Sequence, residues 1–198
     1  MSYYVRVLSP EARPVSADEL ASVVEHLNCA LSCEVPSSRW TELEVVDSSG
    51  EAIFLIERSD VHERSIAPDE LLEFDEEVSE CEPASAADWL RSYLPTVRTI
   101  YAFQILDPIY SGNGWEVLGA VKNTIWAAAG GVIQADGEGF SNEDGYHILW
   151  QFPDDVTGDW WMAVLKDGEW EAFQMDLGNP AHRAAFKAGR IPNGVRLA

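Results

Sequence analysis

The chain has 198 residues, 46% of them hydrophobic and 11% aromatic, and its 34 acidic and 13 basic residues leave a net charge of −21. This much apolar side chain can form a sizeable core, so the composition excludes an intrinsically disordered chain despite the charge. The sequence pI of about 4.3 argues against nucleic acid or an anionic membrane surface as a partner, because both attract Lys and Arg.

A chain of this length is typical of a single domain. Its first residues lack the basic and apolar stretches of a signal peptide, and no apolar run reaches the roughly 18 residues of a membrane span. The cysteines Cys29, Cys33 and Cys81 form no CxxC pattern, which is typical of reduced thiols. We therefore expect a cytoplasmic protein; the sequence indicates no oligomeric state.

The first half of the chain predicts a strand, a helix and three more strands. Aromatic and β-branched residues predict a strand over residues 3–8, and Ser16 with Glu19 forms a capping box before a helix. Further strands are predicted over Leu31–Val35, Glu42–Asp47 and Ala52–Glu57, the last two joined by a hairpin turn.

The stretch from Asp69 to Asp88 contains nine acids and no Lys or Arg. Pro68 can begin a helix there, with Leu71, Leu72 and Val78 on its inner side, and Ser85 can cap a second helix. The break between these helices is the best place for a link between two halves. We expect one globular domain over residues 1–198, with 1–83 and 84–198 as candidate lobes.

The second half repeats the order of the first. The predicted elements are a strand at Thr99–Leu106, a helix at Gly114–Ala129 ended by Gly130 and Gly131, and strands at Val132–Ala135, Tyr146–Phe152, Trp160–Lys166 and Trp170–Met175. The expected fold is α+β, mainly antiparallel sheet with helices on one face, and a duplication into two similar strand–helix–strands halves is left open as an alternative.

The C-terminal tail reverses the charge of the chain. Asn179 and Pro180 can begin a last helix, and the basic residues Arg183, Lys187, Arg190 and Arg196 meet no acid after Asp176. The simplest expectation is a basic helix docked on the protein's own acidic body, and a partner-binding tail is the alternative.

The turn from Asp136 to Gly145 contains four carboxylates within nine residues, Asp136 to Asp144. Oxygen-rich loops suit Ca²⁺, but Ser141 stands where an EF-hand loop requires glycine. The simplest interpretation is a solvated turn without a ligand, and the alternative is a module that calcium stabilises.

Catalytic signals are weak throughout. The four histidines (His26, His62, His147 and His182) form no metal pattern, and His147 is expected to point outward from a strand. Thiol–base pairs of Cys33 with His26 or Cys81 with His62 have no local support, so we interpret these thiols as structural. No nucleophile elbow, phosphate loop or dinucleotide motif is present in the sequence, so no cofactor is predicted.

The segment Gly130–Phe140, preceded by Tyr101–Gln104 and Gly114–Trp115, resembles a recurrent pattern in small uncharacterised bacterial proteins. The resemblance covers about residues 97–152 and implies no activity, so it assigns no functional residue. In size, acidity and mixed α+β character, the chain is also similar to immunity proteins that neutralise bacterial toxins.

Charge and missing motifs together favour a non-enzymatic inhibitor or immunity-type protein that binds a basic protein. A protein whose spaced carboxylates imitate the phosphates of DNA would be one form of such an inhibitor. The alternative is an enzyme or small-ligand binder whose cleft is lined by Trp150, Trp160 and Trp161, with the turn acids at its mouth. The residues expected to bind the basic partner are Glu73, Glu76, Glu77, Glu80, Asp136, Glu138, Glu143 and Asp144.

Overall fold

The computed structural model describes residues 3–32, 39–62 and 65–198. They form an α+β fold, as predicted, and divide into two compact units. Unit 1 consists of Met1–Pro68 and Val97–Gly131, and unit 2 of Asp69–Thr96 and Val132–Ala198. The chain therefore passes between the units three times, at boundaries that differ from the expected division after residue 83.

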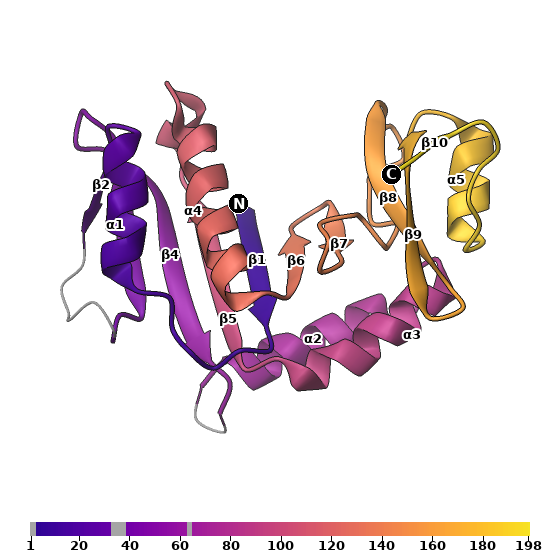
Figure 1. Cartoon of the computed structure of the whole chain (residues 1–198), viewed down its shortest axis with the longest axis horizontal. Coiled ribbons are helices and arrows are strands. Elements are labelled where there is room, and N and C mark those ends of the chain that lie inside the picture. The colour runs from indigo at the N-terminus through magenta and orange to yellow at the C-terminus, as the bar shows by residue number, and fades with distance from the viewer. Residues whose placement is uncertain (1–2, 33–38, 63–64) are drawn as a thin grey trace. The chain divides into compact units, whose positions relative to one another are not determined.

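Unit 1 is an antiparallel sheet with helices on one face (Figure 1). Its strands follow the order β2-β3-β4-β5-β1, where the bounds are β1 Tyr3–Ser9, β2 Ala30–Ser32, β3 Glu42–Val46, β4 Ala52–Asp60 and β5 Thr99–Ile105. The helices are α1 Ala17–His26, the 3-10 helix η2 Asp107–Tyr110 and α4 Gly114–Ala129. Of the predicted strand Leu31–Val35, the last three residues, Cys33 among them, lie outside the described residues.

The core of unit 1 follows from the alternation of side chains along these strands. Val5 lies opposite Phe103, which lies opposite Ile56, which in turn faces Leu43, and all four side chains are buried. Burying such a side chain contributes about 1.5–3 kcal/mol, so one row of this kind stabilises the sheet considerably.

Two sequence signals fix the helix ends of unit 1. Ser16 is the N-cap of α1, as predicted, and its hydroxyl accepts a hydrogen bond from the N–H of Asp18 at 3.2 Å. Helix α4 has the predicted bounds and ends at Gly130 and Gly131, which have φ of +65° and +105°. A side chain on Gly131 would collide with the carbonyl oxygen of Leu8, so this position requires glycine.

Unit 2 contains three helices, short strands and a second core. Its elements are α2 Ala67–Val78 (which begins in the last residues of unit 1), α3 Ala84–Tyr93, the 3-10 helix η1 Leu94–Thr96, β6 Val132–Ala135, β7 Gly139–Ser141, β8 Asp159–Lys166, β9 Glu169–Asp176, α5 Pro180–Lys187 and β10 Arg196–Leu197. Strands β10, β9 and β8 form an antiparallel sheet, and the buried cluster beside it includes Phe152, Met162, Phe173 and Phe186.

The predicted strand Tyr146–Phe152 is wrong. Only His147 makes bridges, to Ser141 on one side and Met162 on the other, while the N–H of Trp150 donates to the carbonyl of Glu82. The backbone of this segment therefore satisfies its hydrogen bonds with several neighbours, so no continuous ladder forms. The segment from Asp136 to Gly145, which was predicted to be a turn, contains the short strand β7.

Two helix details also differ from prediction. Leu72 is 57% exposed. The buried face of α2 is formed by Phe74 and Val78, and Leu72 points in another direction around the helix axis. Ser85 lies inside α3, whose N-cap is Pro83, and so does not cap it.

Helix α5 packs on unit 2, in agreement with the expected docking of the basic tail. The guanidinium of Arg183 donates to the carbonyls of Asp154 at 2.7 Å, Val156 at 2.6 Å and Leu177. The ring of Trp150 lies 5.2 Å from the guanidinium carbon of Arg183 and 5.3 Å from the ammonium of Lys187. The cations thus contact backbone carbonyls and an aromatic face; one carboxylate, Glu82, lies 3.6 Å from Lys187.

Candidate functional site

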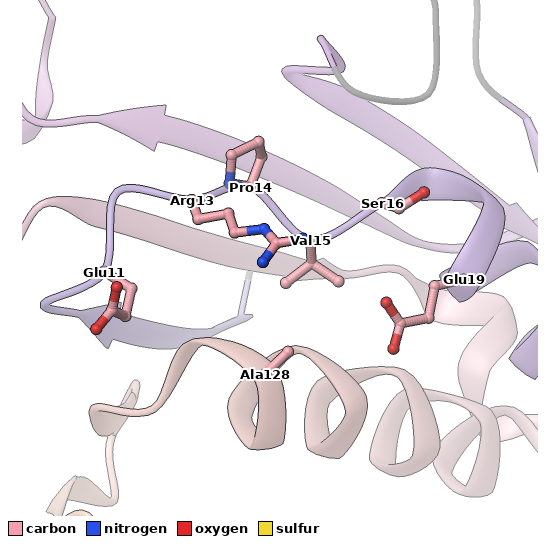
Figure 2. Close-up of a pocket in the computed structure, with 7 residues that line it drawn as sticks. All are labelled: Glu11, Arg13, Pro14, Val15, Ser16, Glu19 and Ala128. Carbon is pink, nitrogen blue, oxygen red and sulfur yellow. The ribbon is translucent and has the colours of Figure 1, made fainter.

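A pocket of about 430 Å³ lies in unit 1 between the segment after β1, the start of α1 and α4 (Figure 2). Figure 2 shows Glu11 and Glu19 at its two ends and Ala128 on α4 below. The lining residues are Glu11, Arg13, Pro14, Val15, Ser16, Glu19 and Ala128.

The wall of this pocket is held by side chains from the sheet and the loop before β3. The indole N–H of Trp40 donates to the carbonyl of Val15 at 2.8 Å, and the Val15 N–H donates to the hydroxyl of Tyr101 at 3.4 Å. The hydroxyl of Thr99 donates to the carbonyl of Glu11 at 3.0 Å. The backbone of the wall is therefore attached to the sheet, although Glu11 and Arg13 are themselves exposed.

The chemistry of the lining is limited. It offers two carboxylates and a guanidinium, and the Ser16 hydroxyl already caps α1. Since no histidine, cysteine or activated nucleophile is among the lining residues, the pocket holds no base–nucleophile pair. It also contains no tryptophan and none of the acids of the 136–144 turn, so it differs from the expected Trp-lined cleft.

The acids predicted on α2 lie on its solvent side. Glu73, Glu76 and Glu77 are exposed on the helix, and Glu80 is exposed two residues beyond its end. Their neighbour Asp75 behaves differently, because Arg91 on α3 binds it at 2.9 and 3.1 Å and lowers the pKa of its carboxyl.

The predicted turn acids fall into two places in unit 2. Asp136 and Glu138 lie between β6 and β7; the next residue, Gly139, lies against Gln151, whose amide donates to Glu77 of α2 at 2.6 Å. Phe74 of α2 also packs edge-on against Phe140 of β7, with ring centroids 5.5 Å apart. The structure thus brings the 136–138 turn to α2.

Glu143 and Asp144 are exposed on a separate turn, where the side chain of Asn142 accepts the N–H of Asp144 at 3.1 Å. The pKa of Tyr93 on α3 is raised, mainly by burial and also by Glu143. In the parts of the chain that the structure describes, no three His, Cys, Asp or Glu side chains gather closely enough to hold a metal ion.

Ser141 and His147 come within 3.4 Å, Oγ to Nδ1, which is a weak hydrogen bond. The imidazole packs on the rings of Trp160 at 4.8 Å and Phe152 at 5.3 Å, so the expectation that it points outward is wrong. Ser141 is only 7% exposed, so its hydroxyl is not presented to a substrate.

The described thiols have the environment of structural cysteines. Burial raises the pKa of the Cys29 thiol and, with help from Glu77, that of Cys81. Both therefore stay protonated at neutral pH, the opposite of an activated nucleophile. The proposed partner thiol Cys33 lies outside the described residues.

Sequence reasoning did not single out one exposed pair, Tyr110 of η2 and Trp115 of α4. Their side chains are 74% and 45% exposed, and their rings meet edge to face with centroids 5.7 Å apart. No pattern in the sequence distinguishes these two rings from the aromatic residues that form the core.

Each described helix is too short or too polar to cross a membrane. Searches of protein-family models, curated proteins and solved structures found no match to this chain. The resemblance to small bacterial proteins accordingly stays a prediction.

Proposed function

We propose that the protein is a non-enzymatic binding protein, of the inhibitor or immunity type, that recognises a basic protein through helix α2. The observation that carries this proposal is the exposed surface of that helix together with Glu80 just beyond its end, which we call the α2 acidic face: Leu72, Glu73, Glu76, Glu77 and Glu80. Among the described residues, no Lys or Arg forms a salt bridge with these four glutamates.

The α2 acidic face combines charge with one exposed apolar residue at its edge, Leu72. Leu72 and Glu76 are four residues apart, as are Glu73 and Glu77, so they form neighbouring rows on the helix surface. An exposed leucine at the edge of a row of carboxylates suits a partner that presents an apolar side chain beside Lys and Arg. The carboxylates attract the partner, and the leucine supplies apolar burial on contact.

The charge of the whole unit favours the same class of partner. Unit 2 contains 20 acidic and 6 basic residues, a net charge of −14, so two thirds of the chain's charge resides there. A field of one sign steers an oppositely charged protein and raises its association rate by 10–10³-fold, roughly, at low salt.

The experiment compares two triple charge reversals against the partner captured from the source lysate. Glu73→Lys, Glu76→Lys and Glu80→Lys change the α2 acidic face and leave Glu77, which binds Gln151, intact. The matched control, Glu25→Lys, Glu42→Lys and Glu51→Lys, changes the net charge equally at exposed sites of unit 1.

The α2 variant is expected to slow association by at least about tenfold, measured by stopped flow, while the control slows it much less. The native rate should also fall as salt is raised from low to physiological concentration. Equal effects of the two variants, or a partner that binds the α2 variant at the native rate, would contradict the proposal.

A further inference from the structure

We call the exposed pair Tyr110 and Trp115 the aromatic platform. Its two rings are held in a fixed arrangement. The two rings come from different elements but contact each other across the turn at residues 111–113. Ile109 is fully buried, and Gly114 lies so close to it that an added Cβ would be 2.5 Å from the Ile109 carbonyl oxygen. Binding to such a preformed surface costs little ordering.

A side-chain hydrogen bond attaches the same turn to the rest of unit 1. The amide of Asn113 donates to the carbonyl of Leu27, at the end of α1, at 3.0 Å. The N–H of Leu106, just before η2, donates to the carbonyl of Ile53 in β4 at 3.1 Å. The platform is therefore part of the unit's framework.

The charged residues nearest to the platform along the chain are negative. Asp107 and Glu116, in the first turns of η2 and α4, are both exposed, and no Lys or Arg occurs in the sequence between Arg98 and Lys122. The N-terminus of α4 adds a partial positive charge of about half a unit, which two carboxylates outweigh.

Elsewhere the chain uses aromatic faces to hold its own cations. Arg58 lies 5.5 Å from the ring centre of Trp40 and Arg196 lies 5.7 Å from that of Trp161, in addition to the two cations on Trp150. Within the described residues, neither ring of the platform has such a cation.

We infer that the aromatic platform is a second docking surface, for an arginine-bearing segment of a basic protein. A guanidinium would stack on the exposed rings, with Asp107 and Glu116 meeting its charge. This inference rests on the proposed function in its class of partner, but it concerns a separate surface in unit 1 and predicts a preference for arginine over lysine.

The test uses hexa-arginine and hexa-lysine peptides as probes, with affinities measured by fluorescence anisotropy at one physiological salt concentration. Both peptides carry the same charge, so attraction to the acidic surface is common to both. Stacking favours arginine, and we expect the native protein to bind hexa-arginine about two- to fivefold more tightly.

Substitutions at Tyr110 and Trp115 test whether the preference for arginine arises at the platform. Tyr110→Ala with Trp115→Ala should abolish the arginine preference while leaving the hexa-lysine affinity nearly unchanged, and both substitutions are exposed enough to preserve folding. The conservative pair Tyr110→Phe with Trp115→Phe retains both rings and should retain part of the preference.

Three results would overturn the inference: equal affinities for the two peptides in the native protein, an arginine preference that survives in the double alanine variant, or an indole NMR signal of Trp115 that does not respond to hexa-arginine. The charge reversals on α2 should weaken the binding of both peptides alike, without changing the ratio of the two affinities. Failure of the platform can therefore be distinguished from failure of the proposed function.

Discussion

At the residue scale, the end of α4 depends on a glycine that no other residue can replace. Gly130 and Gly131 both have positive φ, but only Gly131 lies against another part of the backbone, at the carbonyl of Leu8. Around Gly130 the space for a side chain is open. Adjacent glycines with similar sequence signals thus differ in their tolerance to substitution.

We predict that Gly131→Ala lowers the free energy of unfolding by at least about 2 kcal/mol, because the alanine must adopt a strained φ and displace β1. Gly130→Ala, the control, meets open space but also adopts a backbone conformation that favours glycine (φ +65°, ψ −169°), so it should cost about 1–3 kcal/mol, less than Gly131→Ala. Urea unfolding of the two variants gives the comparison. Equal losses would show that the close approach to Leu8 has no energetic weight.

At the element scale, the arrangement of α5 shows how a basic segment is accommodated in an acidic protein. Arg183 satisfies backbone carbonyls that have no other described donor and at the same time covers Trp150. Phe186, three residues on, is buried in the core of unit 2. The helix is held by packing and directed hydrogen bonds more than by attraction between opposite charges.

Arg183→Ala is expected to lower the stability of unit 2 by about 2–3 kcal/mol, because several charged hydrogen bonds and the stacking are lost together. Arg183→Lys should recover little, since an ammonium cannot donate in the geometry of the guanidinium. The exposed Arg190→Ala should change stability by less than about 0.5 kcal/mol. Thermal unfolding measures all three variants, and an Arg190 effect as large as that of Arg183 would contradict the assignment.

At the scale of the whole molecule, the dominant feature is the net charge of −21. Like charges repel within the folded state more than in an expanded chain, so the charge opposes folding while it favours encounter with a basic partner.

Sodium chloride should accordingly stabilise the free protein at pH 7. Between about 10 and 150 mM salt the screening length falls from roughly 30 to 8 Å, and we expect the melting temperature to rise by a few degrees. The triple lysine variant of α2, which has six fewer negative charges in net terms, should gain less. A melting temperature that is independent of salt would show that self-repulsion is negligible.

Local sequence signals predicted the elements well where hydrogen bonds and periodicity act over a few residues. The cap at Ser16, the bounds of α4 and the Asn179–Pro180 start of α5 were all predicted correctly. The segment 146–152 was not, because its alternating pattern is shared by a strand and by an irregular chain packed between neighbours.

For the two candidate surfaces, too, the sequence predicted some features and left others to the packing of the elements. That α2 would be an acidic helix followed from its composition, but the exposure of Leu72 depended on how Phe74 packs against Phe140. The contact between Tyr110 and Trp115 depended on the close approach of Gly114 to Ile109. Neither could be read from residue order, since both arise between elements.

The sequence by itself determined the α+β class, most element boundaries and the acidic character of the protein, because these depend on composition and on interactions between residues close in the chain. Only the tertiary structure decided which acids of α2 and the turn lie together, how the basic tail is held, and which aromatic rings remain exposed. The first two outcomes depend on contacts between segments distant in sequence, and the third on how the short turn between Tyr110 and Trp115 folds; in each case the geometry of packing selects the partner of each side chain.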